Sequence, residues 1–584
     1  MSSATQPGRE VVQIVELIVP ICANVFGTSP CTATGTGDQK CFNTRATCLD
    51  AENFDGSGTL SLFFSRQSVA ERRIEGADYI IPSLRSVSTA PTKINLSAVD
   101  PDATGLGNRA VCDIELMDHP HTDRVVDPYL ADRSYDPMAR GSFWTKWLRR
   151  WKYRQNITVK VYEGYAGQAL ADMIKRQYVL IEVSGPDASG RVRLKGKDIL
   201  HKLEERKAQC PEASPGVLRT ALLAGAKALA VAGASLSDYP ASGLLRIGDE
   251  FIAYSALSGV DGVLTFTVSE RGAENTVAAD HDAEAAVQLC KQYTAATVQE
   301  IVEDLLTTHA GIDPAMIDSA GSFAQEVSRH LSSYRLNTII SDPVAVNKLI
   351  AELQAQCGFF IWWDERVALI KMRAIRGLET EPPTLTERDH IMPGLSVSEL
   401  PRNRVSQAWV YFSVRDWTQS LDAVNFRQVQ VVADLASESE DRHGDPSIRK
   451  YFSRWLPTGN LAFSSGFKIV NRYSEIPSEA GFQVDAKDGH EYWVGDVFYL
   501  SHGRLVDAHG APVIEQWTVV SADEVVPGET VEYVVENTQL YGRVYEWMAD
   551  DAGVYPGTSA EFAAAYWGDS DGLLSDGTKA ATWG

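Results

Sequence analysis

The chain has 584 residues, of which 44% are hydrophobic, and its 54 basic and 77 acidic side chains give a net charge of −23. This length predicts several domains with cores of ordinary globular composition. The acidic excess disfavours a protein that neutralises nucleic-acid phosphates. No apolar run approaches the roughly 18 residues of a membrane helix, which disfavours a membrane-spanning protein.

The N-terminal segment contains half of the cysteines of the chain. Cys22, Cys31, Cys41 and Cys48 lie within 27 residues, and eight, nine and six residues separate them. Simple proportion predicts roughly 0.4 cysteines in such a window, so the grouping indicates a shared chemical role. The first ten residues lack the basic and apolar segments of a signal peptide, so we do not expect an oxidising compartment, and paired disulfides are the less favoured interpretation.

Metal ligation is the favoured role for these four thiols. Zinc sites usually contain two cysteines about two to four residues apart, because a short turn presents both thiolates to one small ion. This chain has no such pair among the four. Ligation of an iron–sulfur cluster requires no particular interval. On chemistry alone, an iron–sulfur cluster ranks slightly above zinc, and both remain open.

The residues around the cysteines form a more specific pattern. It comprises the apolar strand Val11–Pro20, Cys31-Thr-Ala-Thr-Gly, Cys41-Phe-Asn-Thr-Arg-Ala-Thr-Cys48, Asn53-Phe-Asp-Gly and Phe63-Phe64. This run resembles a segment of tail-tip and hub proteins of long-tailed, siphovirus-type bacteriophages, a family that includes the minor tail protein following the tube in lambda-like phages. The resemblance implies that Cys22, Cys31, Cys41 and Cys48 hold a [4Fe-4S] cluster. In most lambda-like relatives this segment closes a shorter protein, whereas here it opens a long one.

Weaker islands of the same resemblance follow downstream. They are Ile81–Ile94, Leu106–Ile114, Asp118–Asp123 and Phe359–Arg366. The family implies a homotrimeric ring at the distal end of the virion tail, assembled in the host cytoplasm, which joins the tail tube or distal tail protein to a central fibre or spike. DNA would pass through the lumen without specific binding, and an acidic wall suits such a channel.

Strand signals dominate the rest of the chain. Expected strands include 178–183, 191–194, 251–254, 263–268 and 491–494. Helical periodicity is confined to a few places, such as Thr297–Leu306 and Ala345–Gln354, the second preceded by the helix-entry residues Ser341-Asp-Pro. The sequence therefore predicts a mainly β, multidomain α+β protein, with β-barrel or β-sandwich hub domains, a small N-terminal four-cysteine domain and a few helices.

Composition shifts and turn residues suggest six units. They are the cysteine segment 1–65, a β-rich hub domain 66–210 with a tryptophan-rich arm, a hairpin-rich accessory module 211–292, an α+β hub domain 293–376, a β-rich hub domain 377–545 and an irregular extension 546–584. The arm, Phe143–Arg154, interleaves three tryptophans with five basic residues. We expect it to insert its tryptophans into a neighbouring subunit, because aromatic residues and arginine are enriched at interface centres.

Other chemistry is weakly represented. His119 and His121 flank Pro120 between two aspartates and could bind a metal, but a polar loop that leaves a strand is the favoured interpretation. No His-Glu-x-x-His helix or Gly-x-Ser-x-Gly elbow occurs, so we do not expect an enzyme of those classes. Two alternatives to the tail protein remain: an iron–sulfur redox enzyme or electron carrier, and a zinc-stabilised host-recognition module.

Overall fold

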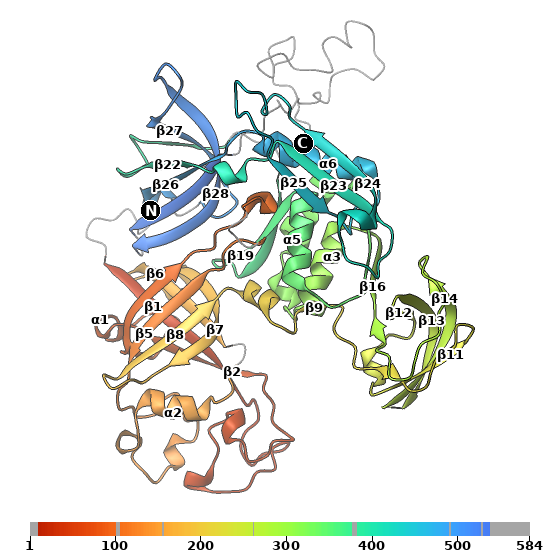
Figure 1. The fold of residues 1–584 in the computed structure, drawn as a ribbon. Coiled ribbons are helices and arrows are strands. Elements are labelled where there is room, and N and C mark those ends of the chain that lie inside the picture. The colour runs from red at the N-terminus through yellow and green to blue at the C-terminus, as the bar shows by residue number, and fades with distance from the viewer. Residues whose placement is uncertain are drawn as a thin grey trace, which may run out of the picture.

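The computed structural model describes residues 10–100, 105–154, 157–260, 262–375, 382–489, 492–526 and 529–537 (Figure 1). Several separate β-sheets surround a smaller helical centre. The prediction of a mainly β, multidomain α+β protein is therefore confirmed. Within the described ranges, no helix has both the length and the apolar character needed to cross a membrane.

The first sheet has eight strands in the order β3-β2-β1-β6-β7-β8-β5-β4. The strands are β1 (Val11–Ile21), β2 (Gly58–Phe64), β3 (Ile80–Ile81), β4 (Leu84–Ala90), β5 (Val111–Met117), β6 (Thr158–Tyr165), β7 (Ile174–Ser184) and β8 (Arg191–Lys197). The backbone N–H of Leu84, at the start of edge strand β4, donates to Ser65 O, next to the end of β2, and so links the two sides of the sheet. The sheet therefore curls into a barrel, which lies at the lower left of Figure 1.

Two long connections leave the same end of this barrel. Residues 22–57 join β1 to β2, and residues 118–157 join β5 to β6. The register places Ile18 opposite Thr158 and Met117 opposite Arg191, so the strand ends that carry both connections are neighbours. The second connection contains helix α2 (Phe143–Arg150), beneath the barrel in Figure 1.

The tryptophans of 143–154 lie inside this chain. Trp144, Trp147 and Trp151 are at most 2% exposed and pack with the barrel strands, and the Trp144 ring stacks on Phe64 at 5.4 Å. The prediction of an arm inserted into a neighbouring subunit is wrong. The spacing of these rings places them on one face of an amphipathic helix and its exit, and that face closes the end of the barrel.

Residues 217–289 form a separate antiparallel sheet in the order β10-β11-β14-β13-β12-β15. Its strands are β10 (Val217–Leu218), β11 (Ala228–Ala232), β12 (Gly243–Ile247), β13 (Glu250–Val260), β14 (Val263–Ala273) and β15 (Gln288–Leu289). Buried aliphatic and aromatic residues from these strands form a core of their own. This unit projects at the lower right of Figure 1.

The centre of the molecule holds the helices and the largest hydrophobic core. Its elements are β9 (Gln209–Cys210), β16 (Lys291–Ala296), α3 (Val298–Asp304), α4 (Ala324–His330), β17 (Leu336–Ile340), β18 (Val344–Ala345), α5 (Val346–Cys357), β19 (Phe359–Asp364) and β20 (Leu369–Ala374). The two helices expected from periodicity are confirmed as α3 and α5. Helix α5 ends at Gly358, whose φ of 75° reverses the chain into the fully buried strand β19.

Two further sheets complete the described chain. One comprises β23 (Gln407–Val414), β24 (Phe426–Ala433) and β25 (Ile448–Phe452), packed on α6 (Gly459–Tyr473). The other has the order β21-β27-β28-β29-β26-β22, formed by β21 (Thr384–Thr386), β22 (Ser396–Glu399), β26 (Ser478–Asp485), β27 (Val497–Val506), β28 (Pro512–Val526) and β29 (Thr530–Asn537). Two helices of four residues, α1 (Gln67–Ala70) and α7 (Ala486–Gly489), lie at strand ends.

The prediction of a strand at 491–494 is wrong where it can be compared. Residues 492–494 form a loop and turn before β27, although Trp493 and Val494 are buried as a strand residue would be. The aromatic and β-branched residues correctly indicated burial at this position. The backbone conformation is that of the turn before β27 and not that of a strand. The expected extension 546–584 lies outside the described residues.

Candidate metal centre

The structure brings the four N-terminal cysteines to one place. Cys22, Cys31, Cys41 and Cys48 all line a single cavity in the connection between β1 and β2, together with Phe26, Asn43, Thr44, Asp50 and Phe54 among others. All four are free thiols of intermediate exposure. The remaining cysteines, Cys112, Cys210, Cys290 and Cys357, are buried at separate places in the fold.

The connection that carries these thiols has little structure of its own. Its regular elements are two single turns of 3-10 helix, Gly37–Gln39 and Arg45–Thr47. Of residues 22–57, only Ala33 and Thr44 are buried. So few buried apolar groups cannot offset the conformational entropy that ordering such a segment costs. Other contacts must hold it.

Hydrogen bonds tie the cysteine-bearing turns to one another. The Cys22 backbone N–H donates to Asn43 O at 2.6 Å. The Thr32 backbone N–H, next to Cys31, donates to Asp50 Oδ2 at 2.6 Å, two residues beyond Cys48. This bond and those from Asn53 hold the pKa of the Asp50 carboxyl below its usual value. The four thiols are therefore positioned pairwise by bonds that do not involve sulfur.

Arg133 fastens the segment to the second connection. Its guanidinium pairs with Asp127 at 2.8 Å, and both side chains are fully buried. It also donates to three carbonyl oxygens of the cysteine segment, those of Gly37, Lys40 and Cys41, at 2.9 to 3.1 Å. Sequence reasoning missed this residue, because its role arises only when two segments about ninety residues apart meet.

Helix α2 reaches the same loop through Arg150. This guanidinium pairs with buried Asp123 and lies 4.0 Å from the centre of the Phe42 ring, next to Cys41. Burial opposes ionisation of Asp123, but bonds from His121, Arg150 and Lys146 hold the pKa of its carboxyl well below the usual range. A cluster of paired charges thus joins helix α2 to the cysteine-bearing connection, residues 22–57.

His121 belongs to this cluster. Its Nε2 lies 3.1 Å from the Tyr79 hydroxyl, and its Nδ1 accepts from the Asp123 backbone N–H at 3.0 Å. Both ring nitrogens therefore have protein partners. The residues lie in the loop that leaves β5, as the favoured interpretation of the Asp118–Asp123 motif predicted.

The thiols themselves have polar partners suited to soft ligands. The Asp50 backbone N–H lies 3.4 Å from Cys48 Sγ, a contact of the kind that stabilises a thiolate. Burial raises the pKa of the Cys41 thiol. A hydrogen bond with the Asn43 backbone lowers this pKa in part, and the neighbouring thiols of Cys48, Cys31 and Cys22 raise it further. A cation held among the four would reverse this mutual penalty, because a coordinated thiol loses its proton.

The four thiols are donors of the chemical type that binds zinc and iron–sulfur clusters. They line one cavity, and each comes from the connection between β1 and β2. The free space between them is about 10 Å³, room for one water-sized sphere, so a larger group requires the loops to spread. In the described ranges, no three His, Cys, Asp or Glu side chains are grouped as ligands of one metal ion are.

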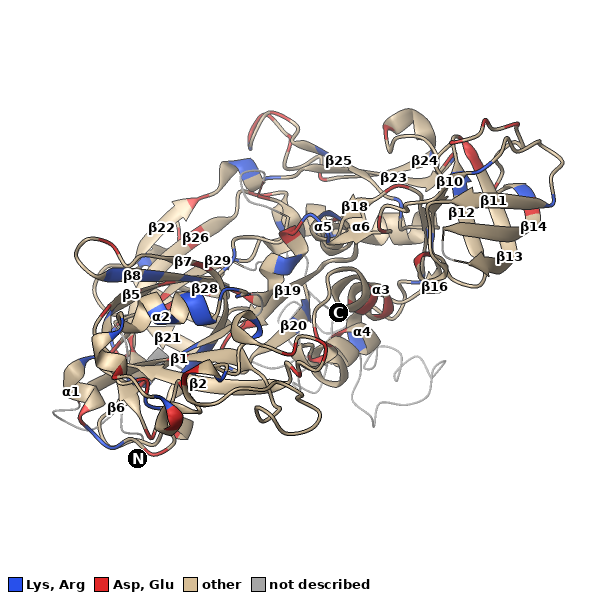
Figure 2. Ribbon diagram, turned by 90° about the horizontal axis from the view of Figure 1, so that it is seen from below, with Lys and Arg blue, Asp and Glu red and all other residues tan. Residues whose placement is uncertain are grey.

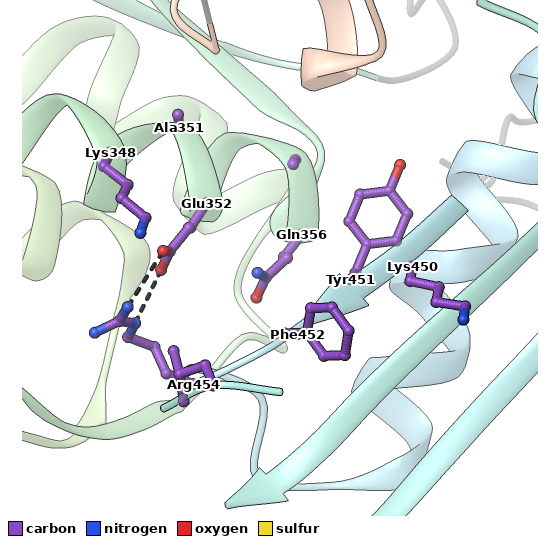
Figure 3. A pocket seen from close by; sticks show the side chains of 10 residues that line it. Lys348, Ala351, Glu352, Gln356, Lys450, Tyr451, Phe452 and Arg454 are labelled. Atoms are coloured by element: carbon purple, nitrogen blue, oxygen red, sulfur yellow. Dashed lines mark hydrogen bonds and ion pairs between the residues drawn. The ribbon is translucent and has the colours of Figure 1, made fainter. Parts of the chain in front are cut away.

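A second cavity lies between α5 and β25 (Figure 3). Lys348, Glu352 and Gln356 line it from the helix, and Lys450, Phe452 and Arg454 line it from the strand side. Its central carboxylate is already engaged, because Arg454 donates twice to Glu352 at 3.0 and 3.3 Å. This ion pair makes the cavity wall a structural contact between helix and sheet.

No protein-family model matches the chain, and no curated protein matches it. Solved structures similar to it include the 43 kDa tail protein of prophage MuSo2 from Shewanella oneidensis, at 11% identity and a TM-score of 0.36, over 79% of this chain and 99% of that one. A tail protein from Neisseria meningitidis has 8% identity and a TM-score of 0.36, over 74% and 89%. Prophage tail protein gp18 from Listeria monocytogenes has 9% identity and a TM-score of 0.33, over 78% and 88%. The structural neighbours are thus phage tail proteins, at a distant level of likeness.

Proposed function

We propose that this chain is a structural component of a bacteriophage tail tip or baseplate hub, and that its N-terminal segment holds a [4Fe-4S] cluster through Cys22, Cys31, Cys41 and Cys48. In this role the chain forms a trimeric ring that connects the tail tube to a central fibre or spike. The sequence pattern from Val11 to Phe64 and the acidic, mainly β composition support the proposal.

The observation that carries the cluster is the convergence of four free thiols on one cavity, while the other four cysteines are buried apart. A segment without a core of its own has little reason to keep four partly exposed thiols together unless they bind something. Four metal–sulfur bonds would supply the folding free energy that its few buried side chains cannot. The cluster's contribution is structural: it is a rigid, four-point covalent brace.

The protein framework prepares this brace. Arg133 and Arg150 hold the loop backbone around Cys41 from the barrel side, and the Cys22 and Cys31 turns are tied across to the Cys41 and Cys48 turns. Loops tethered in this way lose less entropy when the sulfurs engage a common group. The chain's own residues thus orient the donors and limit their exposure to water.

The cofactor is tested by anaerobic purification of the full chain, with iron, zinc and acid-labile sulfide measured on one sample. The expected result is a brown protein with about four irons per chain, as for a cluster with four-thiolate ligation. Colourless protein with one zinc would favour the zinc-stabilised module. Neither metal would refute ligation and reopen the disulfide interpretation.

The tail-tip role needs a separate test. Antibody against the accessory sheet, residues 217–289, should label intact phage particles at the distal tail end in electron micrographs. Native mass spectrometry of the purified chain, alone and with its neighbouring tail proteins, should show three copies per assembly. Labelling elsewhere on the particle would contradict the tail-tip position. A reversible reduction potential with turnover would favour the redox alternative.

A further inference from the structure

Three parts of the molecule meet at one buried junction. They are the barrel, the central hairpin of β19 and β20, and the sheet that contains β28, called here the C-terminal sheet (Figure 1, Figure 2). Strand β7 pairs with β8 only from Val179 onward. Before that point β7 bonds to the hairpin, because the Gln177 backbone N–H donates to Glu365 O at 2.9 Å. The Trp363 indole N–H donates to Gln177 O at 2.9 Å, so the hairpin turn is held against the barrel by two bonds.

Arg176 of β7 is the cation at the centre of this junction. Its side chain is 2% exposed. The guanidinium forms ion pairs with Glu163 of β6 and with Asp523 and Glu524 of β28, the last two at 3.5 and 3.8 Å. Asp523 also accepts from the Thr89 hydroxyl of β4 at 2.9 Å. One guanidinium therefore links the barrel to the C-terminal sheet through carboxylates from both.

A fourth carboxylate comes from the turn of the central hairpin. It belongs to Glu365, which is 4% exposed. The neighbouring Asp364 has its own cations, because it pairs with Lys371 at 2.9 Å and lies 3.6 Å from Arg366. Over the part of the chain that the structure describes, no cation forms an ion pair with Glu365 itself. Arg176 acts on this carboxyl only at longer range.

This arrangement concentrates negative charge in a place without bulk water. In Figure 2, basic and acidic residues are interspersed along the ribbon, whereas here four carboxylates surround one guanidinium. Buried like charges repel strongly, because a low dielectric screens them weakly. Burial raises the pKa of the Glu365 carboxyl to about 7, Arg176 lowers it only in part, and Asp364 raises it further. Burial also raises the pKa of the Asp523 carboxyl.

Other titratable side chains face the junction from the surrounding elements. They are Tyr178 of β7, Cys112 of β5, Glu532 of β29 and Asp496 of the loop before β27. Burial raises the pKa of Tyr178 and of Cys112, so both groups stay neutral between pH 5 and 8. Glu532 and Asp496 are partly exposed, so water can hydrate their charges. Glu365 is therefore the buried carboxyl of the junction whose ionisation adds an uncompensated charge.

We propose that this junction is a proton-operated lock between the barrel, the central hairpin and the C-terminal sheet. While Glu365 keeps its proton, the junction buries a neutral group and the three parts stay docked. Loss of the proton places a further negative charge among the carboxylates around Arg176. The hairpin turn then separates from β7, and water reaches the charges. The lock depends neither on the group that the cysteines hold nor on the position of the protein in a tail.

The direction of the pH dependence follows from linkage between proton binding and docking. The pKa of Glu365 in the closed junction is above its ordinary value of 4.5, so the closed state binds the proton more tightly than the open state. This stabilisation is fully present below pH 4.5 and is lost as the pH rises toward 7. The equilibrium between closed and open junction should therefore shift toward the open state by roughly fiftyfold between pH 5 and 8.

Hydrogen exchange of the full chain at pH 5 and pH 8, corrected for the intrinsic pH dependence of amide exchange, tests the lock. Peptides that contain Gln177 or the turn 363–368 should lose protection by roughly fiftyfold at pH 8, while β13 and β14 keep theirs. Glu365→Gln has a neutral side chain of the same shape, so most of this pH dependence should disappear. Glu182→Gln, at an exposed position further along β7, is the matched control and should behave like the wild type.

Each other outcome overturns the lock. Equal protection of the junction peptides at pH 5 and 8 in the wild type would show that no proton controls docking. A loss in Glu365→Gln as large as in the wild type would assign the effect to another group. A Glu365→Gln variant without protection at either pH would mean that a neutral side chain does not keep the junction closed. A parallel loss in β13 and β14 would indicate global unfolding instead of local opening.

Discussion

The cysteine segment, residues 22–57, and the accessory sheet, residues 217–289, both project from the rest of the molecule, yet they are stabilised in opposite ways. Residues 22–57 bury only Ala33 and Thr44, whereas the sheet of residues 217–289 buries a continuous set of aliphatic and aromatic side chains. The sheet is held from within by its core. The cysteine segment is held from outside by Arg133 and Arg150, and in our proposal from inside by metal–sulfur bonds.

The difference teaches how to interpret the cysteines. Cys290, at the base of the accessory sheet, is buried, and burial raises the pKa of its thiol to about 12, as expected for a small apolar side chain in a core. The four N-terminal thiols are partly exposed in loops that have no core to join. The same residue type therefore packs in one region and offers ligands in the other.

The largest expected effect comes from Cys41→Ser. It should abolish retention of the cluster and leave residues 22–57 open to protease, because one missing bond undoes a four-point brace. Iron content and limited proteolysis followed by mass spectrometry measure both outcomes. Cys290→Ser should keep the wild-type iron content. Equal iron in the two variants would refute the ligand assignment.

Arg133→Ala should cost about 3 to 5 kcal/mol of local stability, because it removes the ionic partner of buried Asp127. Hydrogen exchange of residues 36–43 should accelerate while the accessory sheet stays protected. Arg140→Ala is the control, since Arg140 is exposed and lies over the Tyr135 ring. Unchanged exchange in Arg133→Ala would show that the segment does not depend on this anchor.

The accessory sheet should lose stability in acid. Burial opposes ionisation of Glu250, but bonds from Arg271, the Ala279 backbone, His281 and the Gly272 backbone lower its pKa to about 2. A lowered pKa in the folded state adds stability above the unfolded pKa of 4.5, and this stability is lost as pH falls toward 2. The loss is about 3 kcal/mol. Hydrogen exchange of β13 and β14 between pH 5 and 2 measures it, and Glu250→Gln should flatten the dependence.

The smallest expected effect is that of Ile252→Val in the accessory core. Removing one buried methylene should destabilise the sheet by about 0.5 to 1.5 kcal/mol. Iron content should not change. A change in iron content would mean that the accessory sheet and the cysteine segment are coupled through the centre of the molecule.

Local patterns in the sequence determined much of the architecture. Alternating and β-branched runs located β7, β8, β13 and β14, and helical periodicity located α3 and α5, because these signals depend on neighbours in the chain. The grouping of four cysteines also marked the candidate site. Ligation by these thiols remains a prediction.

Only the tertiary structure shows which residues distant in the sequence contact one another. The tryptophans of α2 look the same in sequence whether they fill the barrel end or a neighbour's groove, and only the closure of the barrel around Phe64 assigns them to this chain's core. The role of Arg133 arises where two connections leave the same barrel end. Arg133 binds carbonyl oxygens about ninety residues away in the sequence, so no local pattern encodes its role.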